Sequence, residues 1–166
     1  MTPRVWKFGD NLDTDAMAPG QYMKSPIEEL ARHCLESVRP EFAAAVRAGD
    51  VVVAGKNLGA GSSREQAPQA LKALGVSALV AVSYAGLFYR NALNLGLAAL
   101  VCAEAGSIVD GEPVVVDIRA GSISLPAQGR TLACEPMPGF LLEMVMAGGL
   151  LAHLQQRLAA QGKERR

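Results

Sequence analysis

The sequence is poor in the residues that hold metals or form disulfides. Its 166 residues include only three cysteines and two histidines. Cys34, Cys102 and Cys134 are widely separated and form no C-x-x-C motif, and the two histidines lack the spacing of a metal-binding pair. We therefore expect reduced, mostly buried thiols, and neither a zinc site nor an iron–sulfur cluster held by this chain alone.

The chain also lacks an excess of charge and a long apolar segment. Sixteen Lys and Arg residues balance sixteen Asp and Glu residues, so no basic field attracts nucleic acid or an anionic membrane. No run of about 18 apolar residues is present to span a bilayer, and the opening Met-Thr-Pro-Arg is unlike a signal peptide. These features predict a cytoplasmic protein with no nucleic-acid or membrane partner.

The composition is sufficient for one stable core. Half of the residues are hydrophobic, and 166 residues is an ordinary length for a single domain. Seven short β-branched or apolar runs bounded by turn-forming residues predict strands, and segments with helical periodicity predict helices. The expected strands are residues 4–8, 50–54, 79–82, 99–102, 113–118, 122–125 and 131–134, and the expected helices are residues 27–35, 41–46, 66–74, 86–95 and a stretch after residue 138.

The order of these elements between residues 50 and 102 predicts parallel strand pairing. Strand, helix, strand, helix and strand follow one another there, and such strands pair through crossover helices. Gly75 and Gly96 follow the two helices, where a left-handed residue commonly ends a helix. The later strands, joined by a turn at Gly121, predict a hairpin. The fold class is therefore α/β with a mixed sheet.

The most informative segment is 59–65, Gly-Ala-Gly-Ser-Ser-Arg-Glu, which joins an expected strand to an expected helix. A glycine-rich turn of this kind presents unpaired N–H groups and the positive end of a helix dipole, which together bind anions. The hydroxyls of Ser62 and Ser63 and the guanidinium of Arg64 add donors suited to a carboxylate or a phosphate. The segment matches neither the P-loop, nor the full dinucleotide fingerprint, nor the nucleophile elbow.

Ser62 and Ser63 can also cap the helix that follows. Glutamate and glutamine three residues later complete a capping box for each of them. Pro68 favours the functional interpretation, because proline belongs in the first helical turn. The helix is therefore expected to begin at about residue 64 or later, which leaves both hydroxyls on the loop.

A second candidate is the acidic segment 9–15, Gly-Asp-Asn-Leu-Asp-Thr-Asp. It is not an EF-hand loop, because Ala16 replaces the required glycine and Tyr22 replaces the closing glutamate. Asp15 ends the segment just before Met-Ala-Pro, where it can be held rigidly, and is a candidate for a chemical role.

These two segments and a third, 83–92, Ser-Tyr-Ala-Gly-Leu-Phe-Tyr-Arg-Asn-Ala, occur in an order and at spacings that resemble the small subunits of 3-isopropylmalate dehydratases, in the aconitase superfamily. The resemblance runs from residue 5 to beyond residue 139. It implies a swivelling β/β/α domain, like the mobile fourth domain of aconitase, formed by residues 1–166. It also implies a separate large subunit that carries a [4Fe-4S] cluster, an active site between the two subunits, and no cofactor on this chain.

The resemblance further implies a hydro-lyase that removes water from a 2-hydroxy acid and adds it back at the neighbouring carbon. In leucine biosynthesis this step converts 2-isopropylmalate to 3-isopropylmalate through isopropylmaleate. By resemblance Ser62 is the base, acting as an alkoxide, while Arg64 holds a substrate carboxylate and Ser63 donates a hydrogen bond nearby. By the same resemblance, Asp15 matches a family residue that helps to orient groups, or to relay protons, through residues of the partner subunit.

Four positions bear on how far the resemblance extends. Ala60, Gln66 and Gly86 stand where the family commonly has cysteine, histidine and arginine. Lys24 lies on a loop that, by resemblance, contacts the variable substituent of the substrate, and relatives with a basic residue there act on substrates with an extra carboxylate. Lys24 therefore leaves homoaconitate- and dimethylmalate-type di- or tricarboxylates open as substrates, unless it is only a solvated loop lysine.

An alternative of a different class is a stand-alone carboxylate-binding or regulatory domain. The retention of both loop serines and the arginine speaks against it, because binding alone does not require an unactivated hydroxyl. A small subunit isolated from its partner would expose its interface, so self-association is also expected.

Overall fold

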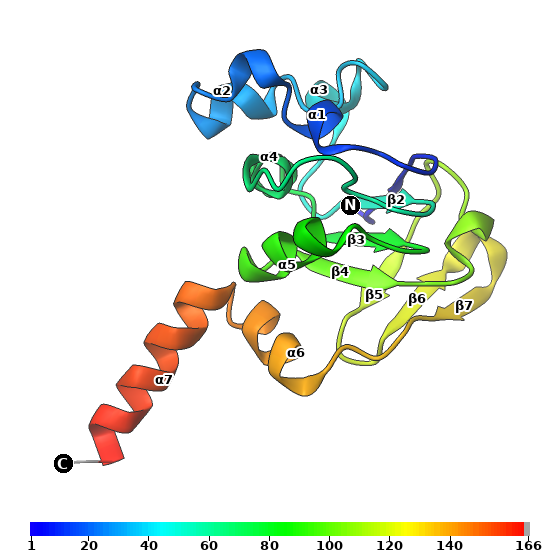
Figure 1. Ribbon diagram of the computed structural model, residues 1–166. Coiled ribbons are helices and arrows are strands. Elements are labelled where there is room, and N and C mark those ends of the chain that lie inside the picture. Colours follow the sequence, from blue (N-terminus) through cyan, green and yellow to red (C-terminus); the bar gives the residue numbers. More distant parts are fainter. Residues whose placement is uncertain (165–166) are drawn as a thin grey trace.

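Four parallel strands form the central sheet of the protein (Figure 1). The structure is a computed structural model that describes residues 1–164. The strand order is β1-β2-β3-β4, and the register aligns Val52 with Leu79 and Val80 with Leu100. Every residue of β2 and β3 is buried, as expected for parallel strands covered on both faces. The strands are β1 (Val5–Lys7), β2 (Val51–Ala54), β3 (Ala78–Ala81) and β4 (Ala98–Val101).

Two crossover helices, α4 (Gln66–Ala73) and α5 (Gly86–Asn94), connect β2, β3 and β4, which confirms the predicted parallel unit. Gly75 and Gly96 follow them with φ values of +88° and +76°. A Cβ on Gly75 would lie 2.8 Å from the Cα of Ala48, so both the conformation and the space require glycine.

The last three strands form a separate antiparallel sheet in the order β5-β6-β7. The α/β class is confirmed, but the parallel and antiparallel strands lie in two sheets and not in one mixed sheet. An antiparallel bridge between Arg4 and Pro113 joins the two parts of the structure at the edge of β1. Proline is tolerated at this position because the flanking residues make the hydrogen bonds of the bridge: the N–H of Val5 donates to the carbonyl of Glu112, and the N–H of Val114 donates to the carbonyl of Pro3, at 3.0 Å each. The strands are β5 (Val115–Asp117), β6 (Ser122–Leu125) and β7 (Arg130–Ala133), with the predicted turn at Gly121.

The remaining helices are mostly short and lie toward the two ends of the chain. The expected C-terminal helix is divided in two by Gly148 and Gly149, which have φ values of +96° and +119°. Its second part, α7, extends away from the body in Figure 1 and carries exposed leucines, among them Leu151 and Leu158. These elements are α1 (Thr14–Met17), η1 (Gly20–Tyr22), α2 (Ile27–Ala31), α3 (Phe42–Ala45), η2 (Ala105–Ser107), η3 (Pro126–Gln128), α6 (Gly139–Met146) and α7 (Leu150–Glu164).

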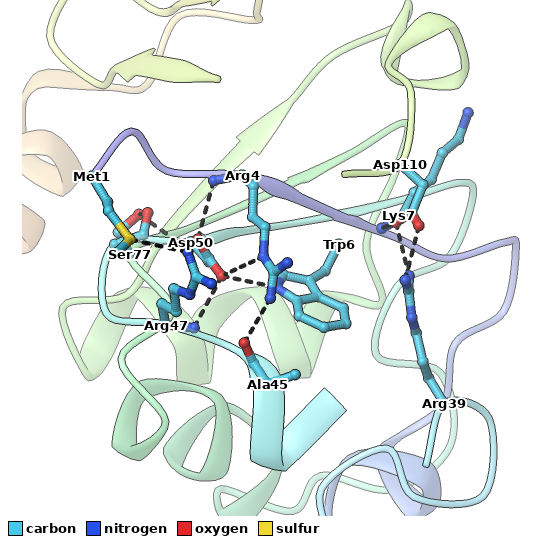
Figure 2. A network of polar contacts seen from close by, with 11 residues as sticks. Met1, Arg4, Trp6, Lys7, Arg39, Ala45, Arg47, Asp50, Ser77 and Asp110 are labelled. Atoms are coloured by element: carbon cyan, nitrogen blue, oxygen red, sulfur yellow. Dashed lines mark hydrogen bonds and ion pairs between the residues drawn. The ribbon is translucent and has the colours of Figure 1, made fainter. Parts of the chain in front are cut away.

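A polar network centred on Asp50 holds β1 in place (Figure 2). The buried carboxylate accepts the indole N–H of Trp6 at 2.9 Å and the backbone N–H groups of Arg4 and Arg47 at 3.0 Å each. The guanidinium of Arg39 lies 4.5 Å from the centroid of the Trp6 ring, within the range of a cation–π contact. Because the acidic segment starts just after β1, this network also sets where that segment begins.

Within residues 1–164, no helix combines the length and the apolar character needed to cross a bilayer.

Candidate functional site

The acidic segment (residues 9–15) and the glycine–serine loop (residues 59–65) lie side by side at the carboxyl ends of β1 and β2. The N–H of Gly59 donates to the carbonyl of Leu12 at 2.8 Å, and the N–H of Thr14 donates to the carbonyl of Ala60 at 2.9 Å. Ligands of open parallel sheets bind outside the carboxyl ends of the strands, so this is the expected edge for a site. Two segments that are far apart in the sequence thus form one surface.

The third segment, 83–92, supports the loop from the side of α5. The N–H of Leu58 donates to the carbonyl of Ser83 at 3.0 Å, and the amide of Asn91 donates to the carbonyl of Ser63 at 3.2 Å. Gly59 has a φ of +87°, and a Cβ there would lie 2.0 Å from Cγ of Phe88. The loop therefore packs directly on a buried aromatic ring, which only glycine permits.

The loop serines do not cap the helix that follows. α4 begins at Gln66, its N-cap is Glu65, and that residue makes no side-chain capping bond. Pro68 is the third helical residue and sacrifices no helical hydrogen bond there. The predicted late start of the helix is confirmed, and both hydroxyls lie on the exposed loop.

Arg64 and Asp15 form an ion pair across the two segments. Nη1 of Arg64 also donates to the carbonyl of Ala18 at 3.0 Å. Within residues 1–164 the Nη2 and Nε groups of Arg64 donate to no protein acceptor, which leaves two parallel N–H donors for a carboxylate. The resemblance implied that Asp15 positions groups or relays protons through residues of the partner subunit, and it did not predict this contact with Arg64.

Ser62 is held by a residue that sequence reasoning missed. Its N–H donates to Oγ1 of Thr14 at 3.1 Å, and its own Oγ lies 3.1 Å from the same atom. Thr14 is buried, with 1% of its surface exposed. The sequence offered one signal, because Thr14 alternates with charged neighbours in the same way as Leu12 and Ala16, which are also buried in the structure.

Of the five predicted site residues, Asp15, Ser62 and Arg64 are brought together. Ser63 is exposed on the same loop, and its hydroxyl has no hydrogen-bond partner among residues 1–164. Lys24 is exposed between η1 and α2 and forms no hydrogen bond or ion pair within the described residues.

A cavity of about 550 Å³ adjoins the site on the side of the acidic segment. Its lining includes Asp13, Asp15 and Arg39 but neither Ser62 nor Arg64. The described part of this chain therefore does not enclose the serine, and a ligand at Ser62 would need a second surface to exclude water from it.

The described residues 1–164 contain no cluster of three or more His, Cys, Asp and Glu side chains placed to hold a metal ion. The cysteines are free, with Cys34 and Cys102 buried. Burial raises the pKa of the Cys34 thiol far above its usual range and that of Cys134 to about 12. The Cys34 and Cys134 thiols therefore remain protonated at neutral pH.

Comparisons with known proteins identify close relatives of the whole chain. The family profile for the aconitase C-terminal domain matches residues 32–105. The chain is 47% identical over 154 residues to the 3-isopropylmalate dehydratase small subunit of Halothermothrix orenii, covering 92% of this chain and 93% of that protein. The chain is also 47% identical, over 151 residues, to the methanogen homoaconitase small subunit of Methanothermobacter thermautotrophicus. This match covers 90% of this chain and 88% of that protein.

A crystal structure of 3-isopropylmalate dehydratase from Methanocaldococcus jannaschii has the same fold. It superposes with a TM-score of 0.93 at 41% sequence identity and covers 98% of each chain.

Proposed function

The chain belongs to the 3-isopropylmalate dehydratase small-subunit family of aconitase-type hydro-lyases, and we propose that with a large subunit it isomerises 2-isopropylmalate to 3-isopropylmalate in leucine biosynthesis. In this proposal the whole chain acts as one swivelling domain. Relatives named as small subunits imply a large-subunit partner.

The observation that supports this chemistry is the grouping of Ser62, Arg64 and Asp15 on one exposed edge. Dehydration of a 2-hydroxy acid requires a base for the proton on the carbon beside a carboxylate, and a group that holds that carboxylate. Ser62 is the proposed base, and the two free N–H donors of Arg64 are the proposed carboxylate clamp. Ser63 adds a hydroxyl donor on the same loop, and Asp15 orients Arg64.

The departing hydroxide requires a Lewis acid, which the described residues of this chain do not supply. We assign that role to a [4Fe-4S] cluster on the large subunit. The exposure of Ser62 is consistent with an active site that closes only when the two subunits meet.

A second candidate substrate is homoaconitate, with dimethylmalate as a third. The identity to the homoaconitase relative equals that to the isopropylmalate relative, so similarity does not discriminate between them. Lys24 is exposed and unpaired among residues 1–164, so it is available for an extra carboxylate. It is equally free to turn its ammonium toward water and present only its methylenes to an isopropyl group.

The test is anaerobic reconstitution with the cluster-loaded large subunit, followed by hydration assays. Isopropylmaleate, cis-homoaconitate, dimethylmaleate and citraconate would be compared side by side. The proposal expects the highest kcat/KM with isopropylmaleate. Preference for another of these acids would retain the hydro-lyase but replace the substrate, and no turnover with any acid from an assembled complex would favour a carboxylate-binding domain.

The same assays test the role of Ser62. Ser62→Ala is expected to lower kcat by at least ~10²-fold, the lower range for lost acid–base catalysis, while subunit assembly is retained. Ser124→Ala, in β6 of the separate antiparallel sheet, serves as the matched control and is expected to turn over normally. Near-normal turnover by Ser62→Ala would remove this residue from the role of base.

A further inference from the structure

The hydroxyl of Thr14 is buried directly behind the exposed Ser62. It is 1% exposed, and its Oγ1 makes two contacts, both with Ser62: it accepts the backbone N–H at 3.1 Å and lies 3.1 Å from the side-chain Oγ. No other hydrogen bond to Oγ1 occurs within residues 1–164. Both hydrogen-bonding contacts of this side chain are thus made with one residue.

A count of protons and lone pairs gives the second contact a direction. A threonine hydroxyl has one proton and two lone pairs. The Ser62 N–H occupies one lone pair. While Ser62 is neutral, either hydroxyl can donate to the other. When Ser62 is an alkoxide it has no proton, so the hydrogen bond exists only if Thr14 donates. A hydrogen bond donated to the charged form lowers the pKa of the acceptor.

The surrounding backbone holds the two oxygens at this distance. The N–H of Thr14 donates to the carbonyl of Ala60, and its carbonyl accepts from Ala18, each at 2.9 Å. Gly61 precedes Ser62 in the loop and has a φ of +101°, and a Cβ there would lie 3.3 Å from Oγ1 of Thr14. Any side chain at position 61 would press on the contact, so glycine keeps the two hydroxyls together.

We propose that Thr14 is a positioning residue that makes Ser62 a stronger base by donating its hydroxyl proton to the Ser62 alkoxide. This inference rests on the proposed role of Ser62. Most of the charged groups in the two segments around Ser62 already have partners: Asp10 accepts the N–H of Lys56 at 2.7 Å, Asp13 accepts the N–H of Ala16 at 2.8 Å, and Asp15 pairs with Arg64. Glu65 is exposed to solvent and forms no hydrogen bond or ion pair within residues 1–164. Arg64 stabilises negative charge in this region, and Thr14 supplies the neutral donor that contacts Ser62 itself.

The first test is the pH dependence of the reconstituted enzyme with Thr14→Val and Thr14→Ser. Valine matches threonine in shape without the hydroxyl, and serine restores the hydroxyl. Thr14→Val is expected to move the acidic limb of the kcat/KM profile to higher pH by about 1–2 units, the range for one charge-assisted hydrogen bond. At pH values below the limb, kcat/KM is then expected to fall about 10–100-fold relative to the wild type, and at pH values above the limb it is expected to recover. Thr14→Ser is expected to retain the wild-type limb. A uniform loss at every pH with an unmoved limb would overturn the proposal, because that result describes only disturbed packing.

Ser62→Ala in the same series separates the two hypotheses. If Ser62→Ala turns over normally, Ser62 is not the base and the proposed function fails in that respect. If Ser62→Ala is inactive and Thr14→Val has the wild-type pH profile, the role of Thr14 fails alone.

The second test needs neither the large subunit nor activity. In the full-length small subunit, Ser62→Cys introduces a thiol whose pKa follows from its rate of alkylation by iodoacetamide at several pH values, read by mass spectrometry of the peptide that contains position 62. Adding Thr14→Val is expected to raise that pKa by about 1 pH unit, and adding Thr14→Ser to leave it unchanged. Equal pKa values in all three backgrounds would overturn the proposal. Thermal unfolding of each variant establishes that the compared proteins are folded.

Discussion

Arg64 in the glycine–serine loop forms an ion pair with Asp15 on α1. The Asp15 side chain is 70% exposed and that of Arg64 26%, so the pair is solvated and adds little to stability. Its effect is geometric. Together with the bond from Arg64 to the carbonyl of Ala18, it fixes one end of the guanidinium and leaves the other donors oriented for a ligand.

We predict that Arg64→Lys lowers kcat/KM by ~10²-fold or more, because lysine cannot donate two parallel hydrogen bonds to a carboxylate. The melting temperature is expected to stay close to that of the wild type. Steady-state kinetics of the reconstituted enzyme give the measurement, and Arg32→Lys, at an exposed position just after α2, is the control. A fully active Arg64→Lys enzyme would show that Arg64 does not clamp the substrate.

The role proposed for Lys24 separates the candidate substrates from one another. If it binds an extra carboxylate, Lys24→Leu is expected to lower kcat/KM for cis-homoaconitate by about 10–100-fold and to leave isopropylmaleate hydration within a few-fold. Lys24→Arg keeps the charge and is expected to retain the preference of the wild type. An unchanged ratio of the two activities in Lys24→Leu would assign this residue to solvent.

Asp50 is expected to make stability depend on pH at the acidic end. Burial raises the pKa of this carboxyl, but hydrogen bonds from Trp6, Arg47 and Arg4 outweigh that effect and leave the pKa below its ordinary value. A carboxyl with a lowered folded-state pKa stabilises the protein above its unfolded-state pKa, about 3.9, and this contribution is lost as the pH falls through the folded-state value.

Asp50→Asn is therefore predicted to lower the free energy of unfolding by about 1.5–3 kcal/mol at pH 7, the range for hydrogen bonds to a charged group. The difference from the wild type is expected to narrow below about pH 4. Urea unfolding at a series of pH values measures both quantities. A difference that stays constant from pH 7 to pH 3 would contradict the assignment.

Gly59 is predicted to be irreplaceable for steric reasons. Gly59→Ala forces a Cβ onto Cγ of Phe88 at a φ of +87°, so we expect a loss of about 2–5 kcal/mol of stability from strain and overpacking together. Gly9→Ala is the matched control, because nothing lies within 4 Å of a Cβ there. Thermal or chemical unfolding compares the two, and equal stabilities would show that the loop shifts freely over the ring.

Much of the fold was predictable because its signals are local. All seven strands begin and end within two residues of the runs that predicted them. The glycines after α4 and α5 have the expected left-handed conformation, and Pro68 correctly indicated that the loop serines precede the helix. α1 was missed, since four residues are too few to show helical periodicity.

The sequence by itself determined the α/β class, the order of strands and helices, the family resemblance, and Ser62, Arg64 and Asp15 as candidates. Each of these depends on neighbouring residues or on a contiguous motif. Only the tertiary structure decided that the strands divide into two sheets, that Arg64 pairs with Asp15, and that Thr14 lies behind Ser62. These contacts join residues distant in the chain, and they exist because β1 and β2 run parallel and bring their carboxyl ends to the same edge.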